Sequence, residues 1–230
     1  MTTKENIIIT RPKPEDLPLT LKQIARYAGG SRYRMDDEMK KMAASIMDKA
    51  KRLVFPALVY AVHDVSDLKN DIRDKLFSFG PSEDVSKVAA CVCTLGPNLE
   101  TEVNKMMKNG SALEGLFFYA AGVGLLESLA NLSFSHITTL ARNYDLYTGC
   151  RFGPGFNNVP MDFQSYLFSM VDSANIGVSL TDSMVMIPAK SWSFFVFLHR
   201  KAPAETNVNK CYRCSLETCP YRIVEVGARW

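Results

Sequence analysis

Three things are scarce in this sequence of 230 residues: histidine, long apolar runs, and clusters of charge of one sign. The most apolar segment, residues 113–132, is interrupted by Glu114 and Glu127, which leaves about twelve uncharged residues where a membrane span needs about 20. The 27 basic and 24 acidic residues are mixed along the chain, so no basic stripe indicates nucleic-acid binding. No secretory signal is visible at the start. We therefore expect a cytoplasmic protein with no membrane and no nucleic-acid partner.

Two common catalytic signatures are also missing. The chain has no glycine-rich phosphate loop and no His-Glu-x-x-His pair, so neither P-loop nucleotide binding nor a zinc-protease helix is indicated. What the chain does have is an apolar fraction of 47%, which is enough for a substantial buried core. The length suits one large domain, or one domain with a small appendage.

Helical and extended patterns alternate without a repeated strand–helix–strand unit, which favours an α+β domain over a doubly wound sheet. A helix start signal lies at Pro14-Glu-Asp-Leu17. Apolar periodicity predicts helices at residues 21–27, 35–53, 99–108, 112–144 and 162–173. Strands are predicted at residues 57–62, 88–94, 183–187 and 192–198, the last two paired around a turn at residues 188–190.

The domain organisation follows from a change in composition near residue 205. Residues 201–210 are polar and are typical of a linker. We expect a single domain over residues 1–205, whose N-terminal helical part covers about residues 14–53, followed by a cysteine-bearing tail over residues 206–230.

Two charged positions stand out as candidates for binding a small molecule. Glu127 is the only acid between Glu114 and Asp145, and a buried carboxylate is costly unless it finds a partner. It lies either on the solvent face of an amphipathic helix or in a site. Arg151 opens the run Arg-Phe-Gly-Pro-Gly-Phe156, which sets a fixed cation beside a bent backbone. Such a combination can hold a small zwitterion, although an ordinary surface turn would also explain it.

These segments, together with residues 176–191, resemble the activation domain of vitamin B12-dependent methionine synthase and the free-standing proteins related to it. Thr181-Asp-Ser183 and Met186-Ile-Pro188 are similar to Thr-Glu-Ser and Met-x-Pro of that family, and Arg151 to Phe156 to its arginine–glycine–aromatic run. Glu127-Ser-Leu-Ala resembles the helix in which a glutamate contacts S-adenosylmethionine. The family's aromatic is usually tyrosine, whereas this chain has Phe156.

The resemblance implies a twisted mixed, largely antiparallel sheet flanked by helices, in a single α+β domain. It also implies that S-adenosylmethionine is bound by residues of the long helix and of the loop after it. These expected cofactor-binding residues are Glu127, Arg151, Gly153, Gly155 and Phe156.

The function implied by the resemblance is the reductive remethylation of inactive cob(II)alamin, as a component of a cobalamin-dependent methionine synthase or methyltransferase system. The chain lacks the Asp-x-His-x-x-Gly run that supplies a histidine to cobalt in cobalamin-binding modules. We therefore expect the cobalamin on a partner, either a corrinoid-binding protein or a truncated methionine synthase. An electron donor such as a flavodoxin or a ferredoxin would complete the system.

The tail carries a second distinctive pattern, Cys211-Tyr-Arg-Cys214-Ser-Leu-Glu-Thr-Cys219-Pro. Three thiols at this spacing could hold an iron–sulfur cluster or zinc with a fourth ligand, for which Cys150, Cys91 and Cys93 are candidates. Free or disulfide-paired thiols explain the pattern equally well. Two alternative functions follow: a metal-binding redox accessory of a corrinoid methyltransferase system, and a docking module that binds a corrinoid protein without the small ligand.

Overall fold

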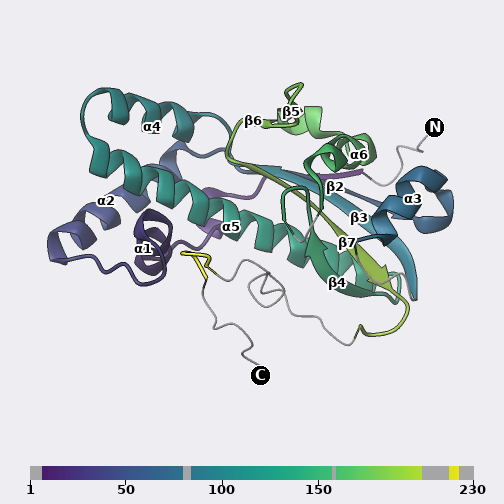
Figure 1. Cartoon of the computed structure of the whole chain (residues 1–230). Helices are drawn as coiled ribbons and strands as arrows, with labels where there is room; N and C mark the ends of the chain where they lie inside the picture. The colour runs from purple at the N-terminus through teal and green to yellow at the C-terminus, as the bar shows by residue number, and fades with distance from the viewer. Residues whose placement is uncertain (1–6, 80–83, 157–158, 204–217, 223–230) are drawn as a thin grey trace.

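The computed structural model describes residues 7–79, 84–156, 159–203 and 218–222. Five strands form one sheet in the order β1-β2-β3-β7-β4, and every neighbouring pair is antiparallel. Their bounds are β1 Ile7–Thr10, β2 Ala57–Asp64, β3 Val85–Thr94, β4 Tyr147–Phe152 and β7 Ser191–His199. A separate small ribbon pairs β5 Ser179–Leu180 with β6 Met186–Ile187. The expected α+β fold with a helix-flanked antiparallel sheet is confirmed (Figure 1).

Helices cover both faces of this sheet (Figure 1). The longest, α5, runs along one face and packs against three other helices on that side. A shorter helix covers the opposite face near β3 and β7. The helices are α1 Leu21–Gly29, α2 Asp37–Leu53, α3 Asn70–Phe77, α4 Asn98–Lys108, α5 Ala112–Arg142 and α6 Gln164–Met170.

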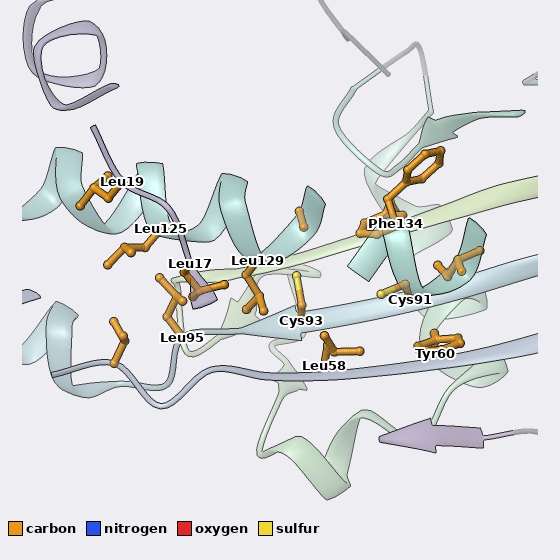
Figure 2. Close-up of a cluster of buried hydrophobic side chains, with 14 of the residues drawn as sticks. Leu17, Leu19, Leu58, Tyr60, Cys91, Cys93, Leu95, Leu125, Leu129 and Phe134 are labelled. Carbon is orange, nitrogen blue, oxygen red and sulfur yellow. The ribbon is translucent and has the colours of Figure 1, made fainter. Parts of the chain in front are cut away.

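The protein has two hydrophobic cores, one on each face of the sheet, because successive side chains of a strand point to opposite faces. On β3, Cys91 and Cys93 face α5, whereas Val92 faces α6. On β7, Phe194 and Phe195 divide in the same way. Figure 2 shows the core under α5, where leucines of the helix meet side chains of β2 and β3. Since both faces are covered, these strands read as continuous apolar runs.

Helix α5 has 31 residues and is therefore about 46 Å long. Among the described residues it is the one helix whose length and composition would suit a membrane span, but 56% of its most apolar window is buried in the protein. The apolar composition is thus explained by packing, as is usual for the core helix of an α+β domain.

Several predicted elements were wrong in detail. The start signal at Pro14 produces only a 3-10 turn, Pro14–Asp16, and α1 begins after Thr20, whose hydroxyl accepts from the Gln23 N–H. The predicted strand 183–187 is shortened to β6, and it pairs with β5 rather than with β7. A turn with Met184 at φ +63° occupies its first half. β7 pairs instead with β3 and β4, which lie far from it in the sequence.

Candidate functional site

Glu127 lies on α5 where helix α1 crosses it, and its carboxylate is held by an ion pair. Arg26 Nη2 is 2.6 Å from Glu127 Oε2, and both side chains are largely buried, with 13% and 16% exposed. Gln23 Nε2 adds a longer contact to the same oxygen, 3.4 Å. A buried carboxylate is tolerated because these donors replace its water. Glu127 is thus neither a solvent-face acid nor an isolated charge.

Arg26 is in turn fixed by the tyrosine that follows it. Its Nη2 donates to the Tyr27 hydroxyl at 2.8 Å, and its guanidinium carbon lies 4.5 Å from the centre of the Tyr27 ring. Burial, together with the nearby Glu127 charge, raises the pKa of Tyr27 well above its ordinary value, so this hydroxyl stays neutral. In this cluster α1 contributes the guanidinium of Arg26 and α5 contributes the carboxylate of Glu127.

Arg151 approaches α5 from the end of β4. Its Nη2 donates to Asn131 Oδ1 at 2.9 Å, and its guanidinium carbon lies 5.6 Å from the Phe134 ring and 5.7 Å from the Trp192 ring. Burial lowers the pKa of Arg151, and nearby acidic groups, Glu127 among them, act in the opposite direction. The guanidinium remains charged because the ordinary pKa of arginine is so high.

The two charged residues predicted from the sequence are therefore found at the same part of α5: Glu127 belongs to this helix, and the side chain of Arg151 reaches it from β4. Asn131, which accepts from Arg151, is four residues after Glu127, and such residues are neighbours on a helix surface, with Cβ atoms about 5–6 Å apart. Figure 1 shows the shared setting, with β4 beside the second half of α5 and α1 beside its middle. The structure brings Glu127 and Arg151 into one neighbourhood, while their role in binding a ligand stays a prediction.

The loop after β4 is shaped by its two glycines. A side chain at Gly153 would place its Cβ 2.2 Å from the Phe156 ring and 2.7 Å from the Ser193 carbonyl oxygen, so only glycine fits. Gly155 has φ +81°, which favours glycine, and its N–H donates to the Val159 carbonyl at 2.9 Å. The Phe156 ring packs edge-on against Trp192, with centroids 6.1 Å apart. The described part of this loop is a tightly packed bend next to Arg151.

The predicted metal site is only partly within the described residues. Cys211 and Cys214 lie outside them, and Cys219 is partly buried. Across residues 7–79, 84–156, 159–203 and 218–222, no group of three or more metal-ligating side chains is present. Of the candidate fourth ligands, Cys91 and Cys93 face α5, whereas Cys150 lies in the core on the opposite face of the sheet. The metal site stays a prediction.

Sequence reasoning missed Arg26, Tyr27 and Asn131. Asn131 had a signal, because it is a polar residue one helical turn after Glu127. Arg26 and Tyr27 had none, since they meet Glu127 only through the packing of α1 on α5, across 101 residues of chain.

Two comparisons with known proteins found a match, one to part of the sequence and one to the fold of most of the chain. Residues 134–218 match the family model "Vitamin B12 dependent methionine synthase, activation domain". A solved structure described as the "Crystal Structure of the MetH Reactivation Domain bound to AdoHcy" is similar in fold, with a TM-score of 0.61 and 15% sequence identity, over 87% of this chain and 80% of that chain. No curated protein matched. The resemblance to the activation-domain family is thus confirmed, by sequence for residues 134–218 and by fold for most of the chain.

Proposed function

We propose that this chain binds S-adenosylmethionine where α5, α1 and the loop after β4 meet, and uses it to reactivate a corrinoid carried by a separate protein. One observation carries the proposal: Arg151, in β4, donates to Asn131 of α5, which lies about one helical turn after Glu127, so a guanidinium and a carboxylate share one neighbourhood. Arg151 also lies within the segment that matches the activation-domain family model.

The opposite charges suit an amino-acid headgroup. The methionyl end of S-adenosylmethionine carries an ammonium and a carboxylate, for which Glu127 and Arg151 are complementary. Each charge-assisted hydrogen bond to such a group contributes about 1.5–3 kcal/mol. The tight bend at Gly153 and Gly155 would present backbone groups next to Arg151, where a flat ligand could approach closely.

The reaction proposed is a methyl transfer coupled to a reduction. A one-electron donor, such as a flavodoxin or a ferredoxin, reduces the corrinoid, and the methyl group of S-adenosylmethionine is then transferred to it. This chain would hold and orient the methyl donor against the partner's cofactor, so its contribution is positioning. The partner would be a corrinoid-binding protein or a truncated methionine synthase, and the system would operate in the cytoplasm.

The first test is the affinity of the purified chain for S-adenosylmethionine, measured by calorimetry. Arg151→Ala should weaken binding at least tenfold, about 1.4 kcal/mol, because the ligand carboxylate loses its cation. Arg142→Ala, which removes an exposed arginine at the C-terminal end of α5, is the matched control and should bind as the parent does.

The outcomes separate the candidate functions. Binding that depends on Arg151, together with transfer of labelled methyl from S-adenosylmethionine to a reduced corrinoid protein, would support reactivation. No heat at millimolar ligand, with retained affinity for a corrinoid protein, would instead support the docking module. Equal affinity in the parent and Arg151→Ala would remove Arg151 from the site.

A further inference from the structure

We propose that a second pocket of this protein, separate from the candidate site, binds a free nucleoside monophosphate. The pocket lies between the segment that follows β1 and the C-terminal end of α2, and its volume is about 750 Å³. Small-molecule sites usually have volumes of about 300–1,000 Å³, so the size is suitable. Its lining comes from residues 11–15 and from the stretch 48–56, which contain none of the residues assigned to the S-adenosylmethionine site.

The pocket carries an excess of positive charge. Four basic side chains line it against two acidic ones, Glu15 and Asp48, so two positive charges are left over. The basic residues are Arg11, Lys13, Lys51 and Arg52. Over the described residues, none of these six side chains takes part in an ion pair. The excess matches a phosphate monoester, which carries about −1.5 to −2 charges at pH 7.

The wall formed by residues 11–15 is held in place by its own backbone. Two of these five residues are prolines, whose rings fix φ near about −65°. The Lys13 N–H donates to Asp16 Oδ2 at 3.0 Å, and Arg11 Nη2 donates to the Asn175 carbonyl at 2.8 Å. A guanidinium has five N–H donors, so this bond orients Arg11 and leaves donors for a phosphate.

The opposite wall presents an aromatic ring that the fold does not bury. Phe55 is 64% exposed, whereas its neighbours Val54 and Pro56 are buried. The Phe55 N–H donates to the Leu95 carbonyl at 2.9 Å, so the backbone that carries the ring is fixed. A flat base can stack on such a ring, and stacking tolerates different bases because each has a π face.

The charge and the ring together favour a nucleotide over simpler ligands. Inorganic phosphate would use the cations and leave Phe55 exposed to water, whereas an uncharged nucleoside would leave the excess charge unmatched. A nucleoside monophosphate uses both, because arginines bind phosphate oxygens through paired N–H groups while the base covers Phe55. Side chains would provide the recognition, in agreement with the lack of a glycine-rich phosphate loop in the sequence.

The test compares three probes with the full chain, by calorimetry at low salt: inosine 5′-monophosphate, inosine and inorganic phosphate. Inosine 5′-monophosphate should bind at least about tenfold more tightly than inosine, which lacks the charged group. It should also bind at least about tenfold more tightly than inorganic phosphate, which has no base to stack. Added salt should weaken its binding, because ions screen the attraction between phosphate and cations.

Substitutions locate the bound nucleotide. Arg52→Gln should weaken the binding of inosine 5′-monophosphate by about tenfold. Lys49→Gln removes the same charge from an exposed position of α2 that does not line the pocket, and should bind as the parent does. Phe55→Ala should also weaken binding by about tenfold, whereas Phe55→Trp should preserve it. Because Arg52 and Phe55 are exposed, these variants should keep the parental melting curve.

Several results would overturn the inference. These are no binding of inosine 5′-monophosphate at millimolar concentration, equal affinity for inosine, or parental affinity in both Arg52→Gln and Phe55→Ala. Weaker nucleotide binding in Arg151→Ala would place the nucleotide at the candidate site and would overturn the inference as well. The proposed function is tested by a different ligand and a different residue, so either conclusion can fail while the other stands.

Discussion

Single residues decide the chemistry of this molecule, and the clearest case is the pair formed by Arg26 and Glu127. The sequence marked Glu127 because a lone acid in an apolar helix needs an explanation. It offered nothing for Arg26, which looks like any cation near the end of a helix. Glu127 could be predicted because the sequence of one helix is enough to show that a charge would be costly to bury. Arg26 could not be predicted, because the partner of that charge depends on how two helices pack.

The two thiols on β3 lead to a prediction about alkaline stability. Burial raises the pKa of Cys93 from 9.0 to about 12, and burial likewise raises the pKa of Cys91. In the unfolded chain these thiols ionise near pH 9, so above that pH the unfolded state binds fewer protons than the folded state. The contribution of these neutral thiols to the free energy of unfolding is fully present below about pH 9 and is lost as the pH rises toward 12.

The free energy of unfolding, measured by urea titration, should therefore fall between pH 8 and pH 10.5. A variant with both Cys91→Ala and Cys93→Ala should be less stable at neutral pH but should lose less stability over this range. Cys219→Ala, at a partly buried thiol outside the core, should show the parental decline. The same pH slope in the double variant and the parent would contradict the prediction.

At the scale of elements, long periodic segments were predictable and short edge segments were not. α2 and α5 follow from apolar periodicity, the central strands β2, β3 and β7 follow from short apolar runs, and the structure confirms all five. β1 and β4 escaped prediction because they are edge strands of four and six residues, and β4 contains Gly149, which is rare in strands. Pairing of β7 with β3 and β4 was likewise not visible, since strand order depends on non-local contacts.

The packing of α1 on α5 depends on small residues. A Cβ at Gly124 would lie 2.6 Å from Leu19 Cδ1, and the Ser128 hydroxyl donates to the Pro18 carbonyl one turn later. Pro18 and Leu19 come just before α1, so this close approach holds the start of α1 against α5, on which Glu127 lies. The sequence contains Gly124 but does not say which neighbour requires it.

Gly124→Leu should push α1 away from α5. We expect the free energy of unfolding to fall by about 1–3 kcal/mol, as for other overpacked sites, and ligand affinity to fall with it, because Arg26 would lose Glu127. Ser135→Leu, at an exposed position of the same helix, is the matched control for added volume. Unchanged stability and affinity in Gly124→Leu would show that α1 does not need this contact.

At the scale of the whole molecule, the described segment 218–222 lies beside α1, close to the candidate site (Figure 1). The Ser31 N–H donates to the Pro220 carbonyl at 2.7 Å, and the Tyr221 ring lies 5.9 Å from that of Tyr27. A segment beyond the sheet domain is therefore anchored on α1, next to the residue that holds Arg26. The expected boundary near residue 205 lies outside the described residues.

Loss of this anchor should be measurable. Tyr221→Ala should lower the free energy of unfolding by about 0.5–1.5 kcal/mol, the usual contribution of an aromatic pair, whereas Tyr221→Phe should preserve it. A double-mutant cycle with Tyr27→Ala isolates the pair from other effects of each substitution. A coupling energy near zero would mean that the two rings are adjacent without stabilising each other.

The place of β7 in the sheet has a consequence for how the protein is made. β7 is the last strand along the described residues, yet it lies in the interior of the sheet, between β3 and β4. While the ribosome is still synthesising the segment before it, β3 has an open edge whose Ala-Ala-Cys-Val-Cys stretch carries no charge. The nascent chain thus passes through a stage in which the sheet is incomplete and the edge of β3 is unpaired. During this stage chaperone binding would prevent aggregation until residue 199 has emerged.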